Sequence, residues 1–105
     1  MTITYFFMDK SKLSIKENSW RARLAARLMK ANNMAIVFGN TIHIWGVTKE
    51  EFLQHEKWVL HEIKHIDQYK QHGYIGFLAK YLWESIRHGY YNNKFEIEAR
   101  AAEDA

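Results

Sequence analysis

The residues best suited to chemistry in this 105-residue chain are those at 61–65, which read His-Glu-Ile-Lys-His. On an α-helix, residues four positions apart lie on the same face about one turn apart. The imidazoles of His61 and His65 can therefore reach one metal ion, while Glu62 lies beside it, turned by about 100°. Zinc with an open coordination position lowers the pKa of a water to about 7, and a neighbouring carboxylate can take its proton. The spacing predicts metal-assisted peptide hydrolysis with Glu62 as general base.

The alternative interpretation of this short pattern is a surface helix with two solvated histidines. The flanking residues argue against it. Val59, Ile63 and Ile66 form an apolar stripe at helical spacing, which would press this side of the helix into a core. We therefore expect a helix that is buried along one side, with its histidines near the buried edge.

The composition narrows the possible chemistry. The chain has no cysteine, so any metal must be held by histidine, carboxylate and water. Its content of 48% hydrophobic and 15% aromatic residues is typical of a folded protein, and we expect one domain spanning 1–105. A net charge of +3 does not by itself indicate a nucleic-acid partner. Without a signal peptide or an apolar run of about 20 residues, we expect a cytoplasmic protein with no membrane span.

The first third of the chain is expected to hold a strand and a helix. The β-forming run at 3–8 predicts a short strand. Residues 14–17, Ser-Ile-Lys-Glu, have the form of a capping box that opens a helix ending near residue 31. The apolar face of that helix is predicted to consist of Trp20, Leu24 and Leu28.

The other side of this helix carries four cations, Arg21, Arg23, Arg27 and Lys30. We interpret them as a solvated face in preference to an anion-binding surface. A nucleic-acid partner, which we do not expect, would show binding that falls steeply with salt.

Residues 34–38 and 41–45 are rich in β-forming side chains and flank Gly39-Asn40, which predicts a β-hairpin. An exposed edge of this hairpin could hold an extended peptide by strand addition. His43 lies on the hairpin, and we interpret it as a strand-surface residue rather than a ligand.

Helices are expected over the remainder of the chain. Residues 48–51 form a second capping box, which opens the helix that carries the two histidines. A break is expected near His55 and the end of the helix at Gly73. A further helix at 74–88 and an alanine-rich one from 96 to about 103 follow. The apolar face of the 74–88 helix is predicted to be Phe77, Leu78, Tyr81, Leu82 and Ile86.

Two histidines do not complete a catalytic zinc site. His72 lies seven residues after His65, about 10 Å along the helix, and is too far away to share the ion. A carboxylate from another helix is the remaining common solution. The last helix offers Glu96 and Glu98, and alanines beyond them would let it approach the histidines closely.

A hairpin, a His-Glu-x-x-His helix, an intervening helix and a helix that begins Phe-Glu-x-x-Ala follow one another over roughly residues 35–100. This order resembles the gluzincin branch of the zincin metallopeptidases. In particular it resembles minimal zincin domains of unknown function from bacteria, whose motif often extends to a glutamine, here Gln68. The resemblance implies a minimal zincin-like fold of the α+β class and a zinc metallopeptidase acting on a peptide or protein substrate.

The resemblance also implies the ligand set. In related families the ligand glutamate begins a Glu-x-x-Ala-Asp motif, which corresponds to Glu96 here, with Ala99 as the small packing residue. The implied site is zinc held by His61, His65 and Glu96, with Glu62 as the catalytic base. The alternatives are a site without a third ligand or one completed by Glu98, Glu84 or His88.

The sequence departs from the family at position 100, where gluzincins usually carry an aspartate that accepts a hydrogen bond from a ligand histidine. Arg100 cannot accept one, so Asp67, Glu98 or a backbone carbonyl would have to substitute. This departure and the small size support a second hypothesis, a weak or inactive zincin-like module that binds a peptide or protein partner. The intact Glu62 counts against that hypothesis.

Stabilisation of the oxyanion is a further requirement of a zinc hydrolase. Tyr90, Tyr91 and His88 precede the proposed ligand helix and could reach the reacting carbonyl. We interpret the two tyrosines as packing residues and assign none of the three a catalytic role.

Overall fold

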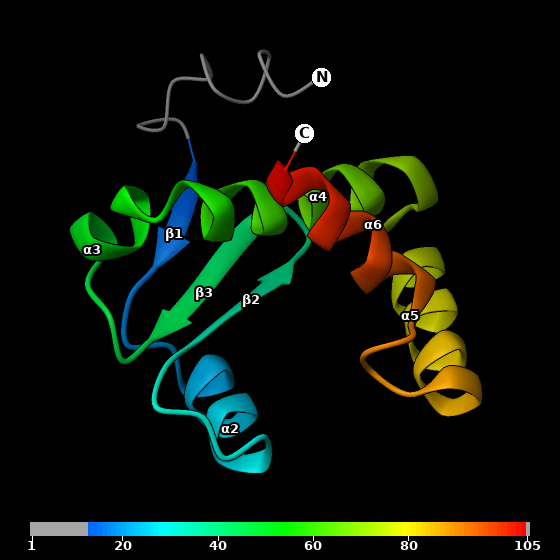
Figure 1. Ribbon diagram of the computed structural model, residues 1–105, viewed down its shortest axis with the longest axis horizontal. Coiled ribbons are helices and arrows are strands. Elements are labelled where there is room, and N and C mark those ends of the chain that lie inside the picture. The colour runs from blue at the N-terminus through cyan, green and yellow to red at the C-terminus, as the bar shows by residue number, and fades with distance from the viewer. Residues whose placement is uncertain (1–12, 105) are drawn as a thin grey trace.

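The computed structural model describes residues 13–104, and the strand expected at 3–8 lies outside this range (Figure 1). The chain is of the α+β class, as predicted. Its elements are β1 (Ser14–Lys16), α2 (Trp20–Leu28), β2 (Met34–Phe38), β3 (Thr41–Trp45), α3 (Lys49–Gln54), α4 (Glu56–His72), α5 (Tyr74–His88) and α6 (Lys94–Asp104).

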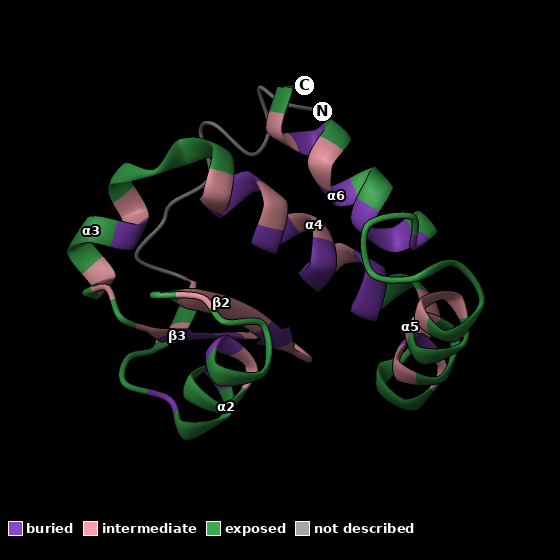
Figure 2. Cartoon of the chain, turned by 60° about the horizontal axis from the view of Figure 1, so that its bottom comes forward, coloured by how far each residue is buried: buried purple, intermediate pink, exposed green. Residues whose placement is uncertain are grey.

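The three strands form one sheet with the order β1-β3-β2, in which β3 runs parallel to β1 and antiparallel to β2. The predicted hairpin is confirmed, and Gly39 in its turn has a φ of 65°. Because side chains alternate along a strand, the two faces of β3 differ. Ile42 and Ile44 join the core with α4, while His43 faces α2. Figure 2 shows α2 on one side of the sheet and α3 and α4 on the other.

The hydrophobic core lies between the sheet and α4 and continues toward α5 and α6. The predicted stripe of Val59, Ile63 and Ile66 is buried there. Phe77 from α5 and Phe95 from α6 complete this core on the far side of α4. The helix that carries both histidines therefore has the sheet on one side and α6 on the other.

The capping box expected at residues 14–17 is wrong. Residues 14–16 form β1, because Ile15 pairs with Ile42 of β3 and this long-range pairing outweighs the local signal. The N-cap of α2 is instead Ser19, whose side chain accepts the backbone N–H of Ala22. The Ser19 hydroxyl also lies 2.9 Å from Nδ1 of His43. His43 is therefore a buried residue, and its interpretation as a strand-surface residue is wrong.

The apolar face predicted for α2 is not the buried one. Trp20, Leu24 and Leu28 are 65%, 50% and 77% exposed, whereas Ala22 and Ala26 are fully buried against the sheet. Two alanines let the helix backbone approach the strands, which turns the larger side chains outward. The helix also ends at Leu28, earlier than the predicted end near residue 31.

The remaining helices follow the prediction more closely. Both hydrogen bonds of the capping box at the start of α3 are present, and the break falls at His55. Gly73 ends α4 with a φ of 78°. The predicted face of α5 is wrong at Leu82 and Ile86, which are exposed. Helix α6 begins at Lys94, two residues before the expected start, because Asn93 accepts the backbone N–H groups of its first turn.

Candidate metal centre

Helices α4 and α6 bring the side chains of His61, His65 and Glu96 together. Nε2 of His61 lies 3.0 Å from Oε1 of Glu96, and Nε2 of His65 lies 3.2 Å from the same oxygen. One ligand atom from each of the three residues lies within 4.8 Å of the other two. The three residues that the sequence and the resemblance indicated therefore form a group that could hold a metal ion.

Packing of α6 against α4 places the carboxylate. Phe95 is inserted into the core, and Ala99 and Ala102 are buried along the same side of α6. Their small side chains allow the close approach that the sequence predicted. Glu96 lies between these residues on the helix and is only 3% exposed, so it faces α4 rather than solvent.

The alternative third ligands lie elsewhere. Glu98 accepts a hydrogen bond from Gln68, and Glu84 accepts the backbone N–H of Lys94. His88 is exposed at the end of α5. Among the residues that the structure describes, the metal-ligand group consists of His61, His65 and Glu96 alone.

Both histidines have an acceptor on their outer ring nitrogen. Nδ1 of His61 lies 2.6 Å from Oε2 of Glu103, and Nδ1 of His65 lies 2.9 Å from Oε1 of Gln68. The amide of Gln68 is oriented because its Nε2 donates to the Phe95 carbonyl at 3.1 Å and to Glu98 at 2.9 Å. Such partners fix the tautomer and orientation of a ligand histidine.

The absence of an aspartate at position 100 is thus compensated by other side chains. Asp67 and the backbone carbonyls proposed from the sequence do not take that role, and Glu98 acts only through Gln68. Arg100 turns away and lies over the ring of Tyr91, 4.2 Å from its centroid. The sequence did not indicate Glu103, although this residue lies seven positions after Glu96 and therefore two helical turns along the same face of α6.

The hydrogen bonds around Glu96 indicate whether the three side chains suit a bound cation. Because Nδ1 of each imidazole faces an acceptor oxygen, each ring carries a proton there and directs Nε2 at the Glu96 carboxylate. Burial acts to lower the pKa of His61 and of His65, but the hydrogen bonds with Glu96 outweigh it and raise both. Burial acts to raise the pKa of Glu96, and the two histidines hold it well below its usual range.

A divalent cation fits this arrangement in donor chemistry and in spacing. Two imidazole nitrogens and a carboxylate oxygen are one of the usual ligand sets of zinc. In a tetrahedral zinc site with bonds of about 2.0–2.1 Å, two ligand atoms stand about 3.3 Å apart. The observed separations of 3.0 and 3.2 Å between the two Nε2 atoms and Oε1 of Glu96 are close to this value.

Glu62 lies next to the three ligand residues. It is 4% exposed, and burial raises its pKa to about 8, with His65 acting in the opposite direction. A carboxylate with a raised pKa binds a proton more strongly than an ordinary surface glutamate. Glu62 is therefore a buried carboxyl beside the centre that holds a proton near neutral pH in these surroundings.

Two tyrosines also reach the centre. The hydroxyl of Tyr81 donates to Oε2 of Glu96 at 2.5 Å, and burial with the adjacent carboxylate raises the pKa of Tyr81. Burial raises the pKa of Tyr90 to about 12, with further contributions from Glu96 and Glu62, so its phenol stays protonated. Tyr91 is largely exposed. The sequence placed Tyr81 on an apolar face and so did not identify its contact with Glu96.

Two depressions flank the centre, and both are lined by His61, Glu62 and Tyr90. The larger, of about 770 Å³, extends past the start of β2 toward the junction of α3 and α4. The smaller, of about 200 Å³, is mainly apolar and is lined by α2, β2, α4 and α5. Its apolar lining includes Met29, Val37, Phe77 and Leu78.

Strand β2 runs between these two depressions. Among the described residues it pairs only with β3, so its other edge faces the two depressions, which together form a cleft along the centre. The carbonyl of Val37 accepts the Tyr69 hydroxyl at 3.0 Å and therefore points away from β3. Alternate residues of an antiparallel strand direct their backbone groups to the same side, so Ala35 presents its N–H and C=O to the cleft.

Comparison of the chain with protein-family models, curated proteins and solved structures gives no match. No helix in residues 13–104 has the length and apolar character needed to cross a membrane.

Proposed function

We propose that this protein is a zinc-dependent metallopeptidase with a minimal zincin-like fold, in which His61, His65 and Glu96 bind the zinc ion. The observation that carries the proposal is the convergence of two Nε2 atoms on one Glu96 oxygen while both Nδ1 atoms are held by acceptors. Two imidazoles and one carboxylate form one of the usual ligand sets of catalytic zinc and leave a position open.

The proposed reaction is hydrolysis of a peptide bond. Bound zinc would supply Lewis-acid activation of a water and of the substrate carbonyl. A bound cation would lower the pKa of Glu62 and so favour its ionised form. The ionised Glu62 carboxylate accepts a proton from the water as the water oxygen bonds to the carbonyl carbon. Glu62 then gives this proton to the amide nitrogen as the carbon–nitrogen bond breaks. The neutral phenol of Tyr90 donates a hydrogen bond to the carbonyl oxygen as negative charge develops on it.

The shape of the cleft supports an extended peptide as the substrate. Ala35 offers a backbone donor and acceptor for strand addition. The apolar pocket beside His65 suits a large apolar side chain, and the wider depression continues the cleft on the other side of Glu62. A cleft that extends past the centre in both directions favours cleavage within a chain over removal of a terminal residue.

Metal content and cleavage of peptides test the proposal. We expect about one zinc ion per chain by elemental mass spectrometry, retained in Glu98→Ala but lost in His65→Ala and Glu96→Ala. Glu62→Gln should keep zinc and lose cleavage of a peptide mixture followed by mass spectrometry. Protein that takes up no metal after incubation with zinc would refute the assignment of the site.

A second candidate is a metal-binding module that holds a peptide without cleaving it. The edge of β2 that pairs with no other strand of residues 13–104 lies beside an apolar pocket, and both features favour this candidate because neither requires a reaction. The two candidates differ in one result. Zinc-loaded protein that retains a peptide unchanged, with equal affinity in the wild type and in Glu62→Gln, would identify the module.

A further inference from the structure

Helix α2 exposes an apolar stripe that no element of the described chain covers. Trp20, Leu24 and Leu28 lie along it, and Met29 at the end of the helix is 50% exposed. Three large side chains at helical spacing normally form the buried face of a helix. Here that face is directed outward, because Ala22 and Ala26 make the contact with the sheet.

The second half of α5 exposes a similar surface. Leu82, Trp83 and Ile86 are 61%, 58% and 70% exposed. Helices α2 and α5 both contribute to the apolar pocket beside β2, but α5 does so through Phe77, Leu78 and Tyr81. At 100° per residue, Leu82, Trp83 and Ile86 lie on the opposite side of α5 from these residues. The exposed apolar side chains of α5 therefore point away from the pocket, and the two helices, which stand apart in Figure 1, present separate surfaces. Contiguous exposed apolar side chains mark sites of interaction.

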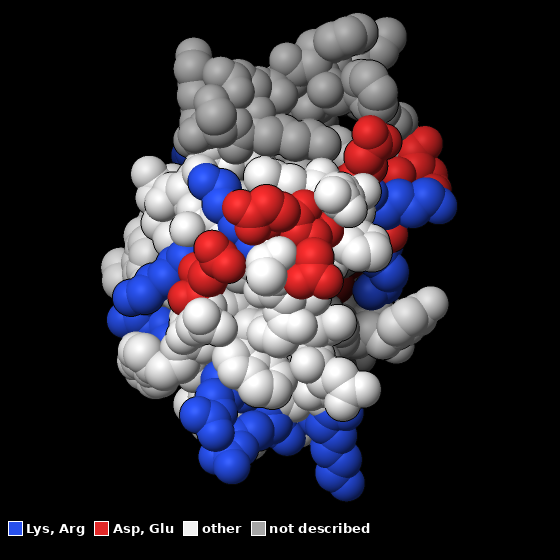
Figure 3. Space-filling model, turned by 90° about the vertical axis from the view of Figure 1, so that its left-hand side faces the viewer, with Lys and Arg blue, Asp and Glu red and all other residues white. Residues whose placement is uncertain are grey.

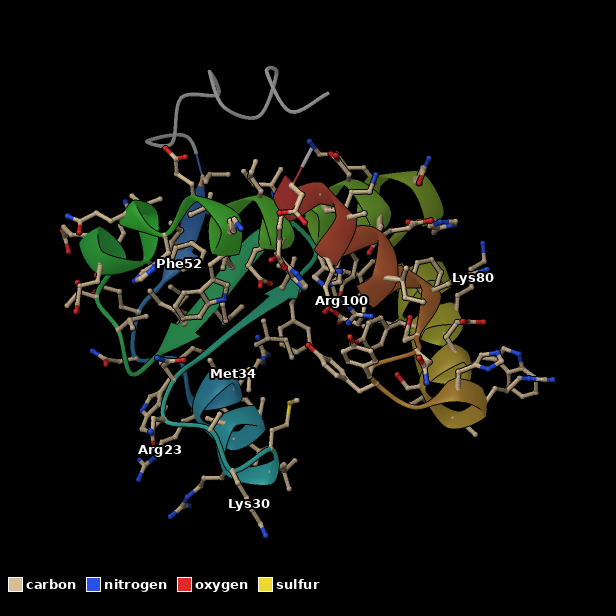
Figure 4. The ribbon with its side chains drawn as sticks, in the orientation of Figure 1. Arg23, Lys30, Met34, Phe52, Lys80 and Arg100 are labelled. Carbon is tan, nitrogen blue, oxygen red and sulfur yellow. The ribbon has the colours of Figure 1, made fainter. Side chains whose placement is uncertain are left out.

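Positive charge accompanies the apolar residues of α2. Helix α2 contains Arg21, Arg23 and Arg27, is followed by Lys30, and contains no acidic residue. Arg23 and Lys30 extend outward from it in Figure 4. Figure 3 shows Lys and Arg side chains gathered at the end of the molecule where α2 lies, whereas Asp and Glu gather above it.

We propose that the exposed surface of α2, with its apolar stripe of Trp20, Leu24, Leu28 and Met29 and its flanking cations, docks on an anionic lipid bilayer. Leucine, methionine and tryptophan side chains enter the boundary between headgroups and acyl chains. Arginine and lysine extend their charged ends from the apolar surface to the lipid phosphates. The docking is peripheral, in keeping with the helices of residues 13–104, none of which is long and apolar enough to span a membrane.

The combination of charge and apolar surface favours lipid over the other occupants. A second copy of this chain would bring the α2 cations of both copies together, and like charges at an interface are unfavourable. Nucleic acid would be matched by the cations but not by the exposed leucine side chains, which find no partner on a phosphate backbone. Anionic lipid matches both the cations and the exposed apolar side chains.

Sedimentation with lipid vesicles tests this proposal on the full chain. We expect binding to vesicles of phosphatidylcholine mixed with phosphatidylglycerol, and at least about tenfold weaker binding to phosphatidylcholine alone. Leu24→Ser/Leu28→Ser and Arg23→Glu/Arg27→Glu should each reduce binding to the mixed vesicles by about tenfold or more. All four positions are exposed, so the fold should be retained, which circular dichroism and zinc content check.

The matched control is Lys57→Glu/Lys70→Glu, which makes the same charge change at exposed positions of α4. It should leave vesicle binding within about twofold. Equal loss in this control, or equal binding to neutral and anionic vesicles, would overturn the proposal. So would a dimer in the absence of lipid that Leu24→Ser/Leu28→Ser dissociates, since that result assigns the surface to a second copy. Binding to an oligonucleotide but not to vesicles would also overturn it.

Discussion

Replacement of Glu103 gives the sharpest test of the metal centre, because no sequence motif indicates this residue. Its Oε2 lies 2.6 Å from Nδ1 of His61, and its side chain is 29% exposed. Glu103→Ala removes the acceptor that holds the His61 ring with Nε2 directed at Glu96. Replacement of such a partner typically weakens metal binding by about 10–100-fold.

The partial exposure of Glu103 places its expected effect at the lower end of this range. Water can replace part of the lost hydrogen bond, so we expect zinc affinity to fall about tenfold in Glu103→Ala, or about 1.4 kcal/mol. Glu103→Gln keeps an acceptor oxygen but loses the charge, so its zinc affinity should lie between those of the wild type and Glu103→Ala. The assay is a competition for zinc against a chromogenic chelator at constant pH and salt.

Asp104→Ala provides the control for Glu103. It removes the same charge from the neighbouring position, where the carboxylate is 76% exposed and lies 3.5 Å from Lys57. We expect its zinc affinity to stay within about twofold of the wild type. A Glu103→Ala protein that binds zinc as tightly as the wild type would show that Glu103 does not orient His61. An equal loss in Asp104→Ala would assign the effect to net charge.

Three other predictions follow from the fold and the cleft. Phe95→Ala should lower the free energy of unfolding by about 3–5 kcal/mol, measured by urea titration, because it opens a cavity in the core beside Phe77. Burial, with Arg21 and Lys16, lowers the pKa of His43, so the stability that neutral His43 contributes is present above about pH 6.5 and is lost as pH falls below it. The difference in free energy of unfolding between the wild type and His43→Gln should therefore shrink as the pH falls from about 7.5 to about 5.5, and a constant difference would contradict the shift. Tyr90→Phe should lower kcat of the peptidase by about a hundredfold with unchanged zinc content, and unchanged kcat would remove Tyr90 from the reaction.

The centre was largely predictable from the sequence because its signals are local. The spacing of His61 and His65 follows from helical geometry, and the capping box at 48–51 fixes where the preceding helix begins. The choice of the third candidate ligand required the resemblance, since the sequence pattern alone left both Glu96 and Glu98 available. Packing distinguishes Glu96 from Glu98, because the burial of Phe95 and Ala99 decides which side of α6 faces α4.

The errors share a physical cause, which is competition between local pattern and long-range contacts. Ser14–Lys16 forms a strand only because β3 is available 27 residues away. The buried face of α2 is decided by how closely its backbone approaches the sheet. Ala22 and Ala26 are therefore buried, and the most apolar stripe of the helix is exposed. Periodicity identifies a helix, but it does not state whether the large or the small side chains make the contact.

The side chain of Asn93 joins α5 to α6 and so affects how the centre forms. It is fully buried, and its Nδ2 donates to the Tyr81 carbonyl and the Ser85 hydroxyl of α5, while Oδ1 accepts the Phe95 N–H of α6. Within the described helix α5, Phe77 alone is fully buried, while Leu78 and Tyr81 are partly buried against the core. These hydrogen bonds and the one from Tyr81 to Glu96 add to that packing in holding α5 in place. Undocking of α5 would therefore release Glu96 from Tyr81. Ligand binding at the centre and docking of α5 are thus thermodynamically linked, and the amide hydrogens of α5 should exchange with solvent more slowly once a metal is bound.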